Sequence, residues 1–428
     1  MKAVRRCGLA TLLALLVGCD QDKDGRSADS SAEDPGGPCT GGAWGSITDE
    51  GEAIHVREDG SDEGDGSSSS PLASLEAALA LSREDGATKR IAVGPGAFDV
   101  SLNLVDETSE SGTDDGLAIQ GCSPDETVFV AADESGPVIK ASAVSGLELA
   151  GFETQGGRRA IWIWQEGSAT LSKVRVRASS RVGIVIDGSY GLLEGSMEEV
   201  EVEDTVEDSV EGGFGYGIQV HGETNGVIVR MKGGQVSKAR SVGVLASGFG
   251  VDLTLEGVTV SDTEASSDGS YGRGVQVQEA AVATLSGGTV LSGNRDAAVY
   301  AIEYQSLNIK DTNVENTAEG SSGEASDDTG DGIVATQDPE NHFSPSQFPV
   351  TLSGVTVDGS ARAAVLLGGV AAFVEGDNSF TGSGYDYEGI LVQQDATVES
   401  SDGYTSLDDL GIALETNVTG LSADELDD

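Results

Sequence analysis

Gly183-Ile184-Val185-Ile186 is the stretch that decides the fold, because its pattern returns along most of the chain. A small residue is followed by alternating apolar residues, and the pattern recurs at 160–163, 217–220, 243–246, 274–277, 298–301, 332–335, 364–367, 389–392 and 411–414. A second pattern lies between these copies, for example Leu253–Val260 and Leu352–Val357. An apolar period of two with many β-branched residues is typical of β-strands.

The spacing of the copies indicates a solenoid. Ile161 and Ile184 are 23 positions apart, and later spacings run from 22 to 34. The long ones hold acidic, Gly/Ser-rich inserts at 203–213, 262–272 and 317–331, all just before the first pattern. Insertions of repeat proteins map to loops on one side. The alternatives are an antiparallel sandwich or a propeller, but a propeller blade needs about 40 residues or more.

We therefore predict an all-β, right-handed, single-stranded parallel β-helix of about 10–12 coils, with equivalent side chains stacked roughly 4.8 Å apart. Gly and Asn are expected at the corners, where a positive φ is cheap for them. Ile54–Val56 reads as a strand, and a capping helix is expected to begin with Ser70 as N-cap and Pro71 as its first residue. Leu72, Leu75, Ala78 and Leu79 would be its apolar face, covering the open end of the solenoid within 53–84.

These residues also carry a resemblance. The runs Asp59–Asp62, Asp65-Gly66, Pro71-Leu72, Ala77-Ala78 and Val93–Gly96 resemble the opening of secreted parallel β-helix proteins of the pectin-lyase-like superfamily. The motifs cover about residues 52–130, and the rest of the chain to about 415 resembles the superfamily by repeat alone. The resemblance implies the fold and no single activity, because the superfamily holds lyases, hydrolases, epimerases and adhesins.

The first residues indicate export. A basic start and an apolar stretch, Gly8–Val17, precede Leu16-Val17-Gly18-Cys19, which matches a bacterial lipobox. The alternative is an ordinary secretory signal with an incidental Cys. We expect a signal peptide over 1–18, lipidation of Cys19, a flexible acidic tether over 19–50, the β-helix over 51–420 and an acidic tail over 421–428. The anchor would hold the protein at the outer membrane or cell surface, with the inner membrane as the alternative.

Two of the remaining cysteines, Cys39 and Cys122, are expected to form a disulfide in an oxidising compartment. Their number and the scattered His residues do not fit a zinc site. The chain has 24 Lys and Arg against 73 Asp and Glu, a net charge of −49. This charge argues against nucleic acid or anionic headgroups as partners and fits a surface adapted to salt or to divalent cations, with solubility alone as the alternative. We expect a monomer. No cofactor is expected, apart from Ca²⁺ on Asp59, Asp62 and Asp65, for which solvated loops are the alternative.

Alternation also assigns the outward side chains of the first pattern. One column reads Trp162, Val185, Gln219, Leu245, Gln276, Tyr300, Val334, Leu366, Leu391 and Ala413, and its neighbour reads Trp164, Asp187, His221, Ser247, Gln278, Ile302, Thr336, Gly368, Gln393 and Glu415. Aromatic rings stack on sugars and amides bind hydroxyls, so Trp162, Trp164, Gln219, Gln276 and Tyr300 are candidate glycan ligands. The alternative is packing of the apolar members under the acidic inserts.

Catalysis has weaker support. Glycoside hydrolysis needs two carboxyls roughly 5–10 Å apart, whereas Asp187 and Glu415 are eight coils apart. A lyase could use Asp187 and His221 on adjacent coils, near the basic cluster Arg158, Arg159, Arg175, Arg177 and Arg181. The alternative for Arg175 and Arg177 is a charge ladder with Glu201 and Glu203.

The sequence is therefore compatible with two functions. The first is a non-catalytic envelope lipoprotein that contacts glycans or proteins. The second is a polysaccharide lyase or related carbohydrate-active enzyme that uses the face around Asp187 and His221.

Overall fold

The computed structural model describes residues 39–40, 53–85, 88–105, 114–223, 226–320, 329–337, 347–381, 389–393, 396–400 and 413–414. The expected signal peptide, Cys19, most of the tether, Glu415 and the acidic tail lie outside the described residues. In the described part, no helix is both long and apolar enough to cross a membrane.

The first repeated pattern forms one parallel sheet, which we call the front sheet. It has twelve strands in the described part of the chain, paired in chain order. They are β4 (Leu102–Val105), β7 (Pro137–Ser142), β9 (Arg159–Trp164), β11 (Val182–Asp187), β14 (Tyr216–His221), β17 (Val242–Ser247), β20 (Arg273–Gln278), β23 (Ala297–Ile302), β25 (Asp331–Thr336), β27 (Val365–Gly368), β30 (Ile390–Gln393) and β32 (Ala413–Leu414).

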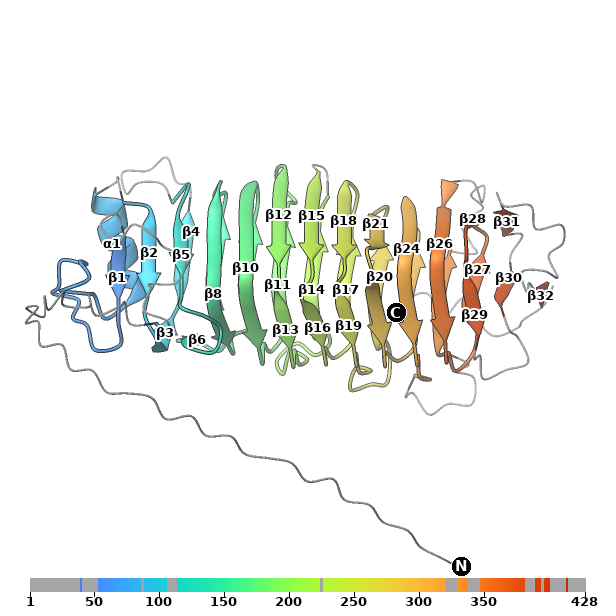
Figure 1. Cartoon of the computed structure of the whole chain (residues 1–428), viewed down its shortest axis with the longest axis horizontal. Coiled ribbons are helices and arrows are strands. Elements are labelled where there is room, and N and C mark those ends of the chain that lie inside the picture. The colour runs from blue at the N-terminus through green and yellow to red at the C-terminus, as the bar shows by residue number, and fades with distance from the viewer. Residues whose placement is uncertain are drawn as a thin grey trace, which may run out of the picture. The chain divides into compact units, whose positions relative to one another are not determined.

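The second pattern forms the bent sheet, whose strands stand side by side in Figure 1. Its twenty described strands are β1 (Ile54–Val56), β2 (Arg90–Val93), β3 (Gly96–Val100), β5 (Ala118–Gln120), β6 (Thr127–Ala131), β8 (Leu147–Gln155), β10 (Gly167–Arg177), β12 (Leu193–Glu198), β13 (Glu201–Glu203), β15 (Val227–Lys232), β16 (Gln235–Ser237), β18 (Val251–Glu256), β19 (Thr259–Ser261), β21 (Val282–Ser286), β22 (Thr289–Ser292), β24 (Ser306–Glu315), β26 (Pro349–Asp358), β28 (Ala371–Glu375), β29 (Ser379–Thr381) and β31 (Thr397–Ser400).

One coil thus consists of a front strand and two segments of the bent sheet, as in β17, β18 and β19. Each strand pairs in parallel with its equivalent in the next coil. Parallel crossovers of this kind are right-handed, and the fold is a right-handed parallel β-helix as predicted.

Residues with positive φ make the corners. Gly257 (φ 62°) divides β18 from β19, and Lys173 and Glu199 take the same backbone conformation at the equivalent bend. The link that leads back to the front sheet starts with positive φ at Ala178, Asp204, Lys238, Asp262 and Asn316. Gly and Asn occupy some of the corners, as expected, and Ala, Asp, Lys and Glu occupy others. Each strained residue is held by ladder hydrogen bonds from the neighbouring coils, for example Lys238 N–H to the Ser261 carbonyl at 3.0 Å.

The interior confirms the predicted columns. Ile161, Ile184 and Ile218 pair directly in register and are completely buried. The same column continues through Val244, Val275, Val299, Ile333, Val365 and Ile390. These side chains belong to one continuous apolar core that also includes the inward residues of the bent sheet.

Close packing explains why most copies of the front pattern begin with a small residue. A Cβ added at Gly243 would lie 2.6 Å from Val260 Cγ1 and 2.6 Å from the carbonyl oxygen of Gly274. Gly183 meets the equivalent Val202 Cγ1, also at 2.6 Å. The front strand begins where it passes closest to the last inward valine of the bent sheet, so a large residue does not fit there.

The solenoid is capped at its N-terminal end by a single described helix, α1 (Leu75–Asp85) (Figure 1). Leu75, Ala78 and Leu79 are buried in the main core beside Ile54 and Ile91, as a cap requires. The predicted start of this helix was wrong. Leu72 donates its N–H to the His55 carbonyl (2.9 Å) and stays extended beside β1, so the helix begins at Leu75.

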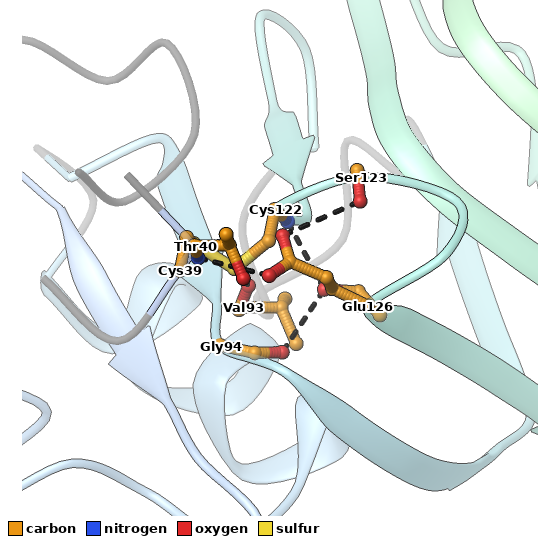
Figure 2. The surroundings of a disulfide bond; sticks show 8 residues. Cys39, Thr40, Val93, Gly94, Cys122, Ser123 and Glu126 are labelled. Atoms are coloured by element: carbon orange, nitrogen blue, oxygen red, sulfur yellow. Dashed lines mark hydrogen bonds between the residues drawn. A yellow bond between two sulfur atoms is a disulfide. The ribbon is translucent and has the colours of Figure 1, made fainter. Parts of the chain in front are cut away.

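A disulfide joins Cys39 to Cys122, the pairing expected from the sequence (Figure 2). Cys122 follows β5, and its N–H donates to Thr127 Oγ1, which in turn donates to the Gly94 carbonyl. Thr40 N–H donates to Glu126 Oε1 at 2.8 Å, and this hydrogen bond is the first cause of the lowered pKa of Glu126. The disulfide and the Thr40 hydrogen bond therefore attach residues 39–40, the described end of the tether region, to the first coils.

The acidic inserts leave the solenoid at one corner. Residues 204–215 link β13 to β14, residues 262–272 link β19 to β20, and residues 316–330 link β24 to β25. Each insert runs from the end of a bent-sheet strand to the start of a front strand, as the sequence predicted.

Candidate functional site

The outward columns of the front sheet have the predicted register. Trp162 pairs with Val185, which pairs with Gln219, and Trp164 pairs with Asp187, which pairs with His221. The columns also extend one coil toward the N-terminus, where Lys140 pairs with Trp162 and Ser142 with Trp164.

Three aromatic residues meet on this face, and we call Trp162, Trp164 and Tyr190 the aromatic cluster. The ring centroids of Trp162 and Trp164 are 5.5 Å apart and their planes are tilted by 34°. Tyr190 follows β11, and its ring meets the Trp164 ring edge-on at 5.7 Å. Both tryptophans are half-buried, whereas Tyr190 is 68% exposed. The two indole rings are therefore tilted by only 34° from each other, and the phenol ring is nearly perpendicular to that of Trp164.

Two cations stack on the cluster. Lys140 Nζ lies 4.8 Å from the Trp162 ring centroid and 5.0 Å from that of Trp164. The Arg159 guanidinium lies 4.7 Å from the Trp162 centroid. Stacking on an aromatic face holds a cation in place while its polar hydrogens stay available for other partners.

The insert between β13 and β14 is fixed beside this cluster by ion pairs. Arg158 Nη2 lies 2.5 Å from Asp208 Oδ2 and 2.7 Å from Glu211 Oε1. Arg181 Nη1 lies 3.3 Å from the same Asp208 oxygen and 2.5 Å from Glu211 Oε2. Burial opposes ionisation of Asp208, but hydrogen bonds from Val210 N–H, Arg158 and Glu211 N–H outweigh it and lower its pKa to about 2.

The arginines on the bent sheet form the charge ladder that was the alternative to a catalytic role. Arg175 pairs in register with Glu201, with Nε to Oε2 at 2.7 Å, and also contacts Asp125 and Glu153. Arg177 Nη2 lies 3.0 Å from Glu203 Oε2. These side chains face outward from the bent sheet and take no part in the front-sheet site.

The other predicted glycan ligands do not join the cluster. Gln219 is half-buried in the same column, beyond Val185. Gln276 is buried and bonded on both sides, to Arg273 Nη1 (3.2 Å) and to Gln278 Oε1 (2.6 Å). Tyr300 packs under the Arg273 guanidinium at 3.6 Å, and burial raises its pKa. Gln276 is thus engaged within the protein and Tyr300 remains half-buried, and their assignment to glycan contact stays a prediction.

Packing also explains the apolar members of the column. Val185, Leu245, Val334, Leu366 and Leu391 are all buried although they point away from the main core. The last three form a second apolar cluster with Ala297 and Ala363. In this column Trp162, Gln219 and Tyr300 are therefore half-buried, whereas the valines and leucines are covered.

Asp187 and His221 are neighbours in register, as predicted. The Asp187 carboxylate, however, accepts hydrogen bonds from Ser189, from its N–H at 3.1 Å and its hydroxyl at 2.5 Å. Among the described residues no hydrogen bond joins Asp187 to His221. The arrangement of a carboxylate that orients the imidazole is absent from this part of the structure.

The three candidate Ca²⁺ ligands serve local structure. Asp59 pairs with Arg57 (3.0 Å), and Asp65 accepts the N–H of Ser67 (3.0 Å). Asp62 accepts the N–H groups of Ala73 and Ser74 and the Ser74 hydroxyl, each at 2.9 Å, at the start of α1. In the described part of the chain no group of three or more His, Cys, Asp or Glu residues could hold a metal ion.

No protein-family model and no curated protein matches this chain. Among solved structures, it is similar to the catalytic domain of a GH87 alpha-1,3-glucanase in complex with tetrasaccharides, with 12% identity and a TM-score of 0.42 over 87% of this chain and 69% of that one. The same domain in complex with nigerose matches with 13% identity and a TM-score of 0.40 over the same shares.

The sequence analysis missed Lys140 and Tyr190. Lys140 lies in Val138-Ile139-Lys140-Ala141, a copy of the front pattern in which valine replaces the small first residue. Ile139 lies 22 positions before Ile161, so the spacing could have revealed it. Tyr190 lies in a corner, where the period of two ends and side-chain direction is not readable.

Proposed function

We propose that this protein is a non-catalytic carbohydrate-binding protein of the bacterial envelope, which holds a glycan on the aromatic cluster. The observation that carries the proposal is the meeting of Trp162, Trp164 and the exposed Tyr190 on one face. Exposed aromatic rings backed by a rigid sheet are suited to stack on the apolar faces of sugar rings at small entropic cost.

Binding without turnover is supported by what surrounds the cluster. Asp187 is engaged by Ser189, and Asp208 and Glu211 are engaged by Arg158 and Arg181. A general acid or base must be within hydrogen-bond reach of the atom to which, or from which, it transfers a proton, and its pKa must suit that transfer. Asp208, with its lowered pKa, is a poor acid.

Glycan-array screening of the full-length protein, followed by calorimetry on the hits, tests the proposal. Trp164→Ala and Tyr190→Ala should each weaken binding by about tenfold, because an aromatic contact contributes roughly 0.5–1.5 kcal/mol beyond the area it buries. Phe373→Ala is the matched control, since Phe373 is a partly exposed aromatic on the bent sheet. Equal losses for Phe373→Ala, or no binding to any glycan, would contradict the proposal.

The lyase alternative is tested by a separate absorbance assay on the same protein. Elimination on a uronate polymer creates an unsaturated sugar with ultraviolet absorbance. We expect no increase in absorbance with uronate polymers. An increase that disappears in His221→Ala would replace the binding proposal with the catalytic one.

We also propose that the protein is exported and lipid-anchored through Cys19, with a membrane as its constant partner. The support is the lipobox Leu16–Cys19. Metabolic labelling with a fatty acid should mark the wild type and leave Cys19→Ser unlabelled. Protease added to intact cells then distinguishes surface display from retention at the inner membrane.

A further inference from the structure

Two of the cations beside the aromatic cluster form no ion pair among the described residues. Of the five arginines in the basic cluster, Arg158, Arg175, Arg177 and Arg181 each have carboxylate partners. Arg159 has none among the described residues, and neither has Lys140. Arg90, Arg230, Arg295 and Lys310 also form no ion pair in the part of the chain that the structure describes, but Lys140 and Arg159 differ from them in stacking on one shared ring, that of Trp162.

Both unpartnered cations are on the ligand face. Lys140 and Arg159 come from adjacent front strands, and both lie over the Trp162 ring, at 4.8 and 4.7 Å. The pKa of Arg159 is lowered by burial and then by repulsion from Arg181 and Arg158. Attraction to Glu211 and Asp187 acts on Arg159 in the opposite direction. Four cations, Lys140, Arg158, Arg159 and Arg181, thus lie near three carboxylates, Asp187, Asp208 and Glu211, at this edge of the site.

We propose that the aromatic cluster binds an acidic oligosaccharide, with one sugar carboxylate placed between Lys140 and Arg159. The inference rests on the proposed function and names the ligand class for the same site. A planar guanidinium offers paired N–H groups that match a carboxylate in geometry. Because Arg159 is stacked on Trp162, its orientation is fixed before the ligand arrives.

The net charge of −49 sets a limit on the ligand. A long polyanion is repelled by the acidic surface, but the repulsion between exposed charges is screened beyond about 8 Å at physiological salt. A short oligosaccharide, or the end of a chain, contacts the local cations and places few charges near the rest of the surface. We therefore expect preference for short acidic oligosaccharides over long polymers of equal composition.

The experiment compares a uronate trisaccharide with its carboxyl-reduced form, which has the same backbone without the charge. The full-length wild type should bind the acidic form at least tenfold tighter at 0.15 M salt. Lys140→Gln and Arg159→Gln should each weaken the acidic form by about tenfold and leave the reduced form unchanged, because one charge-assisted contact is lost. Lys173→Gln is the control for net charge, since Lys173 is an exposed cation on the bent sheet.

The outcomes separate the two proposals. Equal affinity for both trisaccharides, with both weakened in Trp164→Ala, would overturn the acidic ligand and keep the carbohydrate-binding function. Absence of binding to either form would remove the function itself. A sulfated trisaccharide that binds more tightly than the uronate would overturn the assignment to a carboxylate. Lys140→Gln keeps the test decisive if Arg159→Gln fails to fold.

Discussion

Asp208 is the residue on which the position of the insert 204–215 depends. It is 4% exposed, accepts the N–H groups of Val210 and Glu211 within the insert, and contacts Arg158 and Arg181, which lie at equivalent positions of two successive coils. It therefore joins the fold of the loop to its attachment on the solenoid.

The lowered pKa of Asp208 gives a pH prediction. A carboxyl whose pKa falls to about 2 on folding contributes stability that is complete above its unfolded value near 3.8 and is lost as the pH falls toward 2. Pepsin should therefore cleave within 204–215 increasingly between pH 4 and pH 2, as mass spectrometry can follow. In Asp208→Asn the insert should already be cleaved at pH 4. Glu264→Gln, which alters an exposed pair with Arg240, should behave as the wild type.

Gly243 is a second residue whose identity is dictated by its neighbours. Gly243→Ala should destabilise the fold by about 1–3 kcal/mol, because the new methyl overlaps Val260 and the Gly274 carbonyl. Denaturant unfolding measures this loss. Gly226→Ala is the control, since the nearest atom to its added Cβ is 3.5 Å away. Val260→Ala in the same chain should recover part of the loss; a fully additive pair would show that the steric explanation is wrong.

Among the elements, α1 begins at an N-cap, Ser74, whose hydroxyl accepts the Ala77 N–H and which is itself held by Asp62. Asp62→Ala removes three acceptor contacts just before the helix and should cost about 1 kcal/mol. Millimolar Ca²⁺ should not change the melting temperature of the wild type. A Ca²⁺-dependent increase that is absent in Asp62→Ala would show instead that this carboxylate serves a metal. Asp59→Ala, which removes one exposed ion pair, is the matched control.

Sequence predicted elements best where the chain alternates. The register of Ile161, Ile184 and Ile218 followed from the period of two, and so did the outward direction of Trp162 and Trp164. The start of α1 was missed because Ser70-Pro71 has the chemistry of a helix start, while the hydrogen bonds of Leu72 with β1 are long-range and unreadable from local sequence.

The site was predicted only in part, because contacts between residues far apart in sequence are not readable from the repeat. A column tells which side chains point outward, but whether they are exposed depends on what packs over them, as with the buried Gln276. Tyr190 lies in a corner, where the alternating pattern has ended. Lys140 lies in a copy of the front-strand pattern that lacks the small first residue. The contact between distant residues, such as Arg158 with Asp208, is set by loop conformation and not by the repeat.

At the scale of the whole molecule, the described strands pair only with their equivalents in adjacent coils, so stability is expected to be local. Removing the disulfide with Cys39→Ser and Cys122→Ser should cost about 3–4 kcal/mol, since it closes a separation of 83 residues. Hydrogen exchange should accelerate in the first coils, over β1 to β6, and remain unchanged over β15 to β24. Uniform acceleration would mean that the solenoid unfolds as one cooperative unit.

The net charge of −49 leads to a second molecular prediction. Self-repulsion of a surface this acidic opposes the compact state and is screened by salt. The melting temperature should rise by a few degrees between 10 mM and 0.5 M NaCl. A neutral osmolyte at equal osmolality separates charge screening from general exclusion effects, and a melting temperature that falls with salt would mean that the surface ion pairs outweigh the repulsion.

The corner where the inserts leave the solenoid also makes the loops exchangeable. The same junction is bridged by residues 204–215 between β13 and β14 and by residues 238–241 between β16 and β17. Both links begin with a positive φ, at Asp204 and at Lys238, so they leave the bent sheet with the same backbone geometry. The shorter link could therefore replace the longer one without changing the strands on either side. Loops along this edge can also change in length and sequence during evolution while the interior columns stay as they are.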